Sequence, residues 1–250
     1  MFFLKKLFSF KKNETKDVND IALVEFLNSI LGYYPKNVEV FKEAFTHRSA
    51  QKKDEKGNSI NFERLEFLGD ALLGASAATY LYAKAPDQQE GYLTKMRSKI
   101  VSRKQLNHIS KQLGLLAHLE PRNNHSNLGE DVNGDLLEAL VGAIYVDKGA
   151  KATEDFIQSK IIDLHADLDR LELTITSHKS LILEWSQKTR NTLKFNTFEE
   201  QNAEDLQVFV SVIRLNDKVI AKGRGTSKKK AEESASKRAY YMLQKKMDNI

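Results

Sequence analysis

Residues 61–74 read NFERLEFLGDALLG and are the most informative stretch of this chain. They place three carboxylates, Glu63, Glu66 and Asp70, in an otherwise apolar run whose spacing is typical of an α-helix. Positions i, i+3 and i+7 lie on one helix face, where like charges cost about 0.2–0.5 kcal/mol per pair. Such a face destabilises a free helix, but it is well suited to binding a hard cation.

A second acidic pair stands in residues 133–149, NGDLLEALVGAIYVDKG, where Asp135 and Glu138 are three positions apart. Their apolar flanks indicate that both acidic faces look inward or into a cleft, so the two helices can bring their carboxylates to one site. Oxygen ligands without thiols favour Mg²⁺ or Mn²⁺ over zinc. A di-iron centre is disfavoured, because Gly69 and Val141 stand where its Glu-x-x-His pattern needs histidines.

The composition is that of a basic protein without cysteine. The chain has 250 residues, a formal net charge of +5 and no Cys. The positive charge is compatible with a polyanionic partner, and the lack of cysteine excludes disulfides and thiolate metal sites. We therefore expect a cytoplasmic protein. No apolar run approaches the roughly 20 residues of a membrane span, so no membrane partner is expected.

Residues 1–19 are predicted to be a basic tail. They begin with MFFLKKLFSFKK, which mixes apolar residues with lysines but lacks the central apolar region and cleavage site of a signal peptide. A short amphipathic helix that touches a membrane or RNA is the alternative interpretation.

The pattern of apolar residues divides the rest of the chain into two domains. Residues 20–170 show helical spacing throughout, including one helix expected over residues 38–50. Residues 177–246 combine a helix, three short β-type runs and a final helix, with a tight turn at Asn216-Asp217. The predicted fold is multidomain: an all-α domain followed by a small α+β domain of order α-β-β-β-α.

The final helix carries a cluster of cations at its start. Ser227 is a good N-cap, and the first turn after it holds Lys228, Lys229 and Lys230. The helix dipole disfavours cations there by about 0.3–1 kcal/mol, whereas a bound phosphate would favour them. We therefore expect this end to contact an anionic backbone. Gly223 and Gly225 would let the preceding strand pass close to the helix.

Three motifs of the first domain resemble bacterial ribonuclease III: AFTHRSA (44–50), ERLEFLGDALL (63–73) and GDLLEALVGAIYVD (134–147). The C-terminal stretch GRGTSKKKAEESASKRA (223–239) resembles the double-stranded RNA-binding domain of that family. The resemblance covers residues 20–245 and implies a homodimeric, Mg²⁺-dependent endonuclease that cuts double-stranded RNA. Mn²⁺ would substitute for Mg²⁺, and no small-molecule cofactor is implied. The implied products carry 5′-phosphates, 3′-hydroxyls and two-nucleotide 3′ overhangs, and the implied substrates are precursors of ribosomal, messenger and other structured RNAs.

The resemblance also implies roles for individual residues. The metal-binding carboxylates would be Glu66, Asp70, Asp135 and Glu138, with Asp70 and Glu138 as the catalytic residues. Glu63 and Glu90 would be accessory acids at the edge of the cleft, and Phe67 would be a knob inserted into the partner subunit. In the RNA-binding domain, Lys228, Lys229 and Lys230 would contact phosphates, while Gln187 and Glu184 would reach 2′-hydroxyls.

Several other residues invite a functional interpretation. His47 in the THRS stretch is a candidate general base, but a structural hydrogen-bonding role is favoured. Trp185 is expected in the core of the second domain rather than as a stacking platform for bases. Five basic residues are candidates for phosphate contacts, with simple solvation as the alternative: Lys95, Arg97, Lys99, Arg103 and Lys104.

The sequence departs from the family pattern in one loop. Domains of this kind usually carry Gly-Pro-x-His between their first two strands, whereas this chain has Asn202-Ala203-Glu204-Asp205. Acidic residues beside phosphates should weaken RNA binding by the isolated domain.

Two alternative functions are compatible with the sequence: a non-catalytic duplex-RNA binder, and a nuclease that works with the ribosome on one precursor. The presence of all four carboxylates favours an enzyme.

Overall fold

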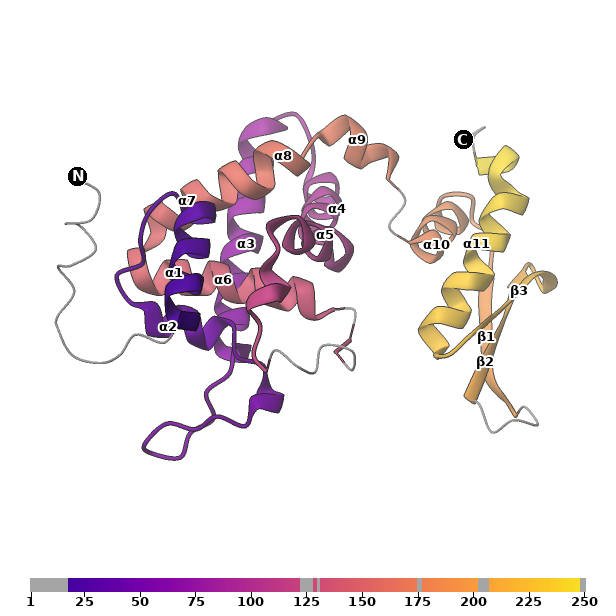
Figure 1. Cartoon of the computed structure of the whole chain (residues 1–250). Helices are drawn as coiled ribbons and strands as arrows, with labels where there is room; N and C mark the ends of the chain where they lie inside the picture. The colour runs from indigo at the N-terminus through magenta and orange to yellow at the C-terminus, as the bar shows by residue number, and fades with distance from the viewer. Residues whose placement is uncertain (1–17, 122–127, 130, 175–176, 202–206, 248–250) are drawn as a thin grey trace. The chain divides into compact units, whose positions relative to one another are not determined.

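The computed structural model describes residues 18–121, 128–129, 131–174, 177–201 and 207–247. The chain divides into two compact units between Glu172 and Leu173. The first unit is helical and the second contains one small sheet (Figure 1), so the predicted fold class is confirmed. Within the described residues, no helix combines the length and the apolar character needed to cross a membrane.

The first unit is built from helices. In chain order they are α1 (Val18–Leu31), α2 (Val38–Ala44), the 3₁₀ turn η1 (Arg48–Ala50), α3 (Glu63–Lys84), α4 (Glu90–Ile100), α5 (Arg103–Leu113), the 3₁₀ turn η2 (Leu115–His118), α6 (Val132–Lys148), α7 (Ala150–Ile157), the π-helical turn η4 (Gln158–Ile162), α8 (Asp163–His165) and α9 (Leu168–Leu173). Gly114 and Gly149 follow α5 and α6 with φ of 72° and 80°. Glycine adopts a positive φ without strain, so both residues can end their helices.

Helix α6 is the centre of the first unit. Every residue from Val132 to Ile144 is buried except Asp135, which is half-buried, so α6 is surrounded on all sides. Its main partner is α3, and Figure 1 shows the two helices crossing inside the unit. Leu65 and Leu73 of α3 join the same core as Leu136 and Leu140 of α6. The two acidic stretches therefore belong to the pair of helices with the most extensive contact in this unit.

Two glycines bring the backbones of α3 and α6 into contact. A Cβ atom added to Gly69 would lie 1.7 Å from the carbonyl oxygen of Glu138. A Cβ atom added to Gly142 would lie 2.2 Å from the carbonyl oxygen of Leu65. No larger residue fits at either position without separating the helices. This close approach places the acidic first turn of α3 beside the acidic residues of α6.

The single helix predicted over residues 38–50 is wrong. α2 ends at Ala44, and a separate 3₁₀ turn forms at Arg48–Ala50. Between them the chain pairs with Glu120: its N–H donates to the carbonyl of Phe45 at 2.8 Å, and its carbonyl accepts from His47 N–H at 2.9 Å. These bonds replace the helical bonds that the periodicity of the sequence would otherwise support.

The second unit has the predicted order α-β-β-β-α. It comprises α10 (His178–Lys188), β1 (Leu193–Gln201), β2 (Gln207–Leu215), β3 (Lys218–Gly225) and α11 (Lys228–Met247). The strands form one antiparallel sheet in the order β1-β2-β3. Asn216 and Asp217 join β2 to β3 with φ of 47° and 65°, as the predicted two-residue hairpin turn requires.

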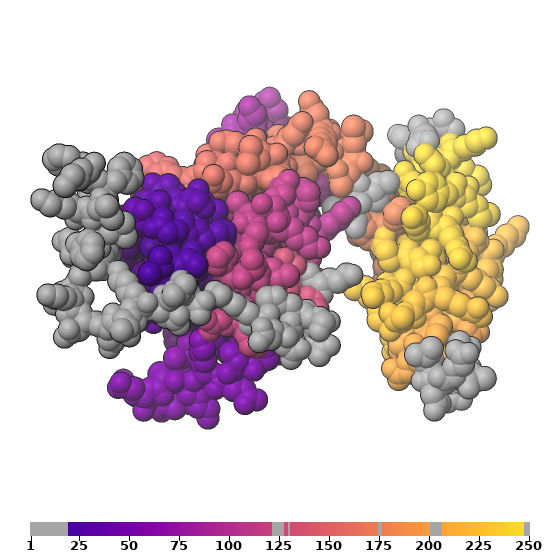
Figure 2. Space-filling model, viewed as in Figure 1, coloured from indigo at the N-terminus to yellow at the C-terminus, as the bar shows by residue number. Residues whose placement is uncertain are grey.

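A small apolar core joins the helices of the second unit to its sheet. Ile182 of α10, Ile213 of β2 and Ala235 of α11 are all buried in it. A Cβ atom on Gly223 of β3 would lie 2.2 Å from the nitrogen of Ala235, so the predicted need for glycine is confirmed here. α11 therefore lies directly on the sheet, and its yellow atoms form much of the visible face of this unit (Figure 2).

Candidate metal centre and RNA-binding module

Three carboxylates from two helices meet where α3 and α6 cross. Glu66 lies in the first turn of α3, and Asp135 and Glu138 lie on α6. One carboxylate oxygen from each lies within 4.8 Å of the others. These three residues, called the carboxylate group below, can together hold one hard divalent cation. The fourth predicted ligand, Asp70, is exposed one turn further along α3 and is outside the group of three.

The carboxylate group concentrates negative charge in a partly buried place. Burial, together with the charges of Asp70, Asp135 and Glu66, raises the pKa of Glu138 to about 7 against the opposing charge of Arg103. Burial also raises the pKa of Glu66 and that of Asp135. Only 6% of Glu138 is exposed to solvent. A cation held by these oxygens would favour their charged forms and remove this penalty.

One arginine reaches into the carboxylate group. Nη1 of Arg103, the first residue of α5, forms an ion pair with Oδ1 of Asp135 and lies 3.9 Å from Oε2 of Glu138. Arg103 is therefore not simply solvated, and its contact with phosphates stays a prediction. The two partners are 32 positions apart in sequence, so no local spacing could have revealed the pair.

A second predicted phosphate contact is wrong. Lys99 of α4 is 4% exposed, and its Nζ donates to the carbonyl oxygens of Leu171 at 2.6 Å and Glu172 at 3.2 Å. It therefore holds the end of α9 against α4. The remaining three candidates, Lys95, Arg97 and Lys104, are exposed on α4 and α5.

The predicted accessory residues surround the carboxylate group unevenly. Glu63, at the start of α3, is exposed and lies 3.8 Å from Nη1 of Arg48. Its charge helps to raise the pKa of Glu66, after the larger effects of burial and Asp135. Glu90 is exposed at the start of α4 and accepts a hydrogen bond from Thr94. Neither belongs to the group of three.

Phe67 follows Glu66 on α3 and is 81% exposed. A phenyl ring in water leaves a large apolar area unburied, which is unfavourable unless another surface covers it. Tyr82, further along the same helix, is 77% exposed. The structure therefore presents Phe67 outward, as a knob would have to be.

His47 has the structural role favoured by the sequence. Its Nδ1 accepts a hydrogen bond from Ser49 N–H at 3.2 Å and so caps the 3₁₀ turn Arg48–Ala50. The backbone N–H of His47 donates to the carbonyl oxygen of Glu120. Burial and the charge of Arg48 lower the pKa of His47.

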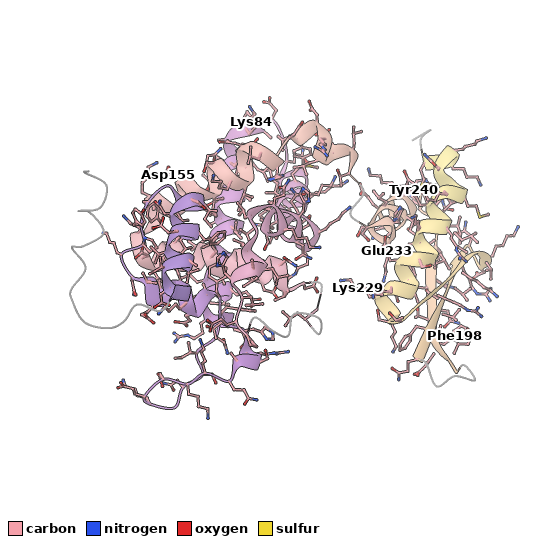
Figure 3. All side chains as sticks on the ribbon, in the orientation of Figure 1. Lys84, Asp155, Phe198, Lys229, Glu233 and Tyr240 are labelled. Carbon is pink, nitrogen blue, oxygen red and sulfur yellow. The ribbon has the colours of Figure 1, made fainter. Side chains whose placement is uncertain are left out.

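The three lysines of the second unit lie at the N-terminal end of α11. Lys228, Lys229 and Lys230 are exposed, and Figure 3 shows Lys229 at this end of the helix. Ser227 caps the helix as predicted, because its Oγ accepts from Lys230 N–H at 3.2 Å and its carbonyl accepts from Ala231 N–H. The cations thus face solvent at the positive end of the helix dipole, where an anion would be favoured by both.

A carboxylate of α11 holds the start of α10. Oε1 of Glu233 accepts from His178 N–H at 2.7 Å, and Oε2 accepts from the Ser177 hydroxyl at 3.0 Å. Burial raises the pKa of Glu233, but these bonds outweigh it and hold the pKa below its ordinary value. Glu233 is labelled in Figure 3 on α11. The two helices that carry the predicted RNA contacts are therefore fastened to each other.

The remaining predicted RNA contacts are placed as follows. Glu184 and Gln187 are exposed on α10, and Glu184 lies 3.1 Å from Nζ of Lys188. Trp185 is 8% exposed, which confirms a core position. The acidic loop Asn202-Ala203-Glu204-Asp205 lies outside the described residues.

Both units match known domain families. Residues 37–164 match a family described as ribonuclease-III-like, and residues 178–243 match the double-stranded RNA binding motif. Over 248 residues the chain is 46% identical to a protein named Ribonuclease 3 from Flavobacterium psychrophilum, covering 99% of each. It is 49% identical over 222 residues to Ribonuclease 3 from Zunongwangia profunda, covering 89% of this chain and 91% of that protein.

A solved structure agrees with these matches. The nuclease domain of ribonuclease III from Campylobacter jejuni superposes with a TM-score of 0.50 at 30% identity, covering 62% of this chain and all of that domain. A helical domain with converging carboxylates, followed by an α-β-β-β-α module, defines a nuclease joined to an RNA-binding domain. The chain belongs to the ribonuclease III family, and it is an endoribonuclease of that family.

Proposed function

We propose that this protein hydrolyses phosphodiester bonds of double-stranded RNA with Mg²⁺ as its cofactor. The products would be 5′-phosphate and 3′-hydroxyl ends with two-nucleotide 3′ overhangs, from cytoplasmic precursors of ribosomal and other structured RNAs. The convergence of Glu66, Asp135 and Glu138 within 4.8 Å carries the metal part of this proposal. The double-stranded RNA binding motif over residues 178–243 supports the substrate class.

The carboxylate group fits a hard divalent cation. It offers only oxygen donors, as Mg²⁺ and Mn²⁺ prefer. Burial and the charges of three neighbouring carboxylates raise the pKa of Glu138 to about 7, and a divalent cation would counteract this effect. When bound, Mg²⁺ would lower the pKa of water and offset the charge that builds on the phosphate under attack.

The residues of this chain would divide the work. Glu66, Asp135 and Glu138 would hold the metal. Asp70, exposed on the next turn of α3, would be the fourth ligand and would help to position the attacking water. Glu63 and Glu90 would act as accessory acids at the rim. Lys228, Lys229 and Lys230 would hold phosphates of the duplex while Gln187 and Glu184 contact 2′-hydroxyls. We propose domain limits of 20–170 for the nuclease and 177–246 for the RNA-binding domain.

We further propose that the enzyme works as a homodimer. Phe67 supports this, because an 81% exposed phenyl ring gains about 1.5–3 kcal/mol when another surface buries it. Between Phe67 and Tyr82 the exposed positions of α3 include Ala71 and Ala75, whose small side chains would let a second helix approach. One duplex could then meet one carboxylate group from each subunit.

Cleavage of an end-labelled duplex RNA of about 30 base pairs is expected only with Mg²⁺ or Mn²⁺ and not with EDTA. The carboxylates are themselves negative and would repel the phosphate. A divalent cation is therefore needed to offset the charge of the phosphate under attack. A gel that resolves single nucleotides would also show the two-nucleotide 3′ overhangs. Binding of an intact duplex under every divalent ion would instead make the chain a non-catalytic RNA binder.

Changing Lys228, Lys229 and Lys230 together to Gln is expected to weaken duplex binding and its dependence on salt. Each lost phosphate contact lowers the slope of log K against log salt by about 0.9, so three contacts lower it by between two and three. Binding is measured with the full-length protein in EDTA, where no cleavage occurs. A variant with Lys218, Lys237 and Lys246 changed to Gln removes the same charge elsewhere on the unit. Equal losses in the two variants would show that only net charge matters.

A further inference from the structure

We propose that Arg103 is an internal counter-cation of the carboxylate group and competes with the divalent metal ion for it. The inference rests on the proposed function, because it takes Glu66, Asp135 and Glu138 as the metal ligands. It adds a residue that holds the group together without metal and sets how much metal the protein needs.

The contacts of Arg103 place one cation on two of the three ligands. Its Nη1 donates to Oδ1 of Asp135 and lies 3.9 Å from Oε2 of Glu138. The charges of Asp135, Glu138 and Asp131 together raise the pKa of Arg103, against the effect of burial. A guanidinium group is charged at every relevant pH, so this neutralisation is always available.

The fold around Arg103 leaves space for its side chain. A Cβ atom on Gly134 would lie 3.2 Å from Cδ of Arg103, which is tighter than an ordinary contact, and 3.4 Å from its Nη1. The N–H of Gly134 donates to Oδ1 of Asn107 at 2.7 Å, which fixes the start of α6 against α5. Arg103 thus crosses the beginning of α6 close to the backbone of Gly134, where a larger residue would press on its side chain.

A metal ion and Arg103 would use the same oxygen atoms. A divalent cation held by Asp135 and Glu138 would stand within a few ångströms of the guanidinium group, and like charges at that distance repel even in water. Either Arg103 withdraws or the metal binds more weakly. Withdrawal is open to it, because 46% of its side chain is exposed.

The first test measures Mn²⁺ binding to the full-length protein by calorimetry, without RNA. Arg103→Gln is expected to bind Mn²⁺ about tenfold more tightly than the wild type, because one positive charge leaves the site. Arg103→Lys keeps the charge and should stay near the wild-type affinity. Lys111→Gln removes an exposed charge from the far end of α5 and serves as the matched control, with a change of less than about twofold.

Thermal unfolding separates this role from that of a simple structural ion pair. Without metal, Arg103→Gln should melt below the wild type, because the carboxylates lose their counter-cation. With saturating Mn²⁺ the difference should disappear, since the metal then supplies the charge. A structural ion pair would cost the same stability under both conditions.

Two results would overturn the inference. Unchanged or weaker Mn²⁺ affinity in Arg103→Gln would show that Arg103 does not compete, and metal-dependent cleavage by the wild type would leave the proposed function standing. If neither protein bound millimolar Mn²⁺ and the wild type cut no RNA, the proposed function would fail together with the inference.

Discussion

Glu138→Gln is expected to reduce cleavage of duplex RNA by about a thousandfold or more while leaving duplex binding nearly unchanged. Glu138 is the most buried carboxylate of the group and faces both α3 and Arg103. An amide has nearly the same shape but no charge, and it is a weak ligand for Mg²⁺. Losing several kcal/mol of charge stabilisation corresponds to this fall in rate. Single-turnover cleavage with saturating enzyme measures it.

The same variant should be more stable than the wild type when no metal is present. The pKa of Glu138 is about 7 in the folded protein and near 4.5 when unfolded. The folded state therefore holds the proton more tightly, so the free energy of unfolding falls as pH rises from about 4.5 to about 7 and stays low above that. Glu138→Gln removes this loss and should gain about 1–3 kcal/mol at pH 8 in EDTA.

Glu154→Gln, at an exposed position of α7, provides the control for Glu138→Gln. It should change neither cleavage nor the pH dependence of unfolding. Added Mg²⁺ connects cleavage with stability. It should stabilise the wild type above pH 7 and stabilise the Glu138→Gln variant much less. Cleavage by Glu138→Gln at the wild-type rate would show that Glu138 is not a ligand of the metal.

Gly69→Ala is expected to destabilise the protein by about 3 kcal/mol or more. The new methyl group would stand 1.7 Å from the carbonyl oxygen of Glu138, and the obstacle is backbone, which cannot rotate away. Overpacking of a close helix contact usually costs about 1–3 kcal/mol, and backbone against backbone lies at or above the upper end. Denaturant unfolding in EDTA measures the change in the free energy of unfolding.

Gly91→Ala is the matched control, because Gly91 also lies in a helix but has no atom within 4 Å of its added Cβ. Alanine there should stabilise the protein by about 0.5–1 kcal/mol. At low temperature, where Gly69→Ala still folds, its cleavage should also fall, since the helices that carry the ligands are forced apart. Wild-type stability in Gly69→Ala would contradict the tight crossing of α3 and α6.

The sequence predicted the parts of this molecule that depend on local spacing or on long motifs. Glu66, Asp135 and Glu138 converge as expected, because helical periodicity placed each pair on one face and the resemblance joined the pairs. The hairpin at Asn216-Asp217 followed from local turn chemistry. Such signals lie within a few residues of one another and survive in any tertiary context.

Contacts between distant segments could not be predicted in this way. The end of α2 is set by Glu120, more than 70 positions away, and not by any helix-breaking residue. Lys99 has the appearance of a solvated or RNA-binding lysine, yet carbonyls from residues 171 and 172 bury it. Arg103 likewise pairs with a distant residue, Asp135, which lies 32 positions further along the chain. A charged side chain carries no local sign of the partner that the fold will bring to it.

The fastening of α10 to α11 by Glu233 would limit which kind of duplex the second unit accepts. Because one carboxylate binds the start of α10 from the side of α11, the contacts expected on the two helices keep a fixed separation. Two contacts at a fixed separation fit a duplex whose grooves repeat at the matching distance. They cannot both form on a duplex with a different groove spacing. The wide, shallow minor groove of A-form RNA and the narrower one of B-form DNA differ in just this dimension. Discrimination would then come from groove geometry together with the proposed 2′-hydroxyl contacts, without the reading of a single base.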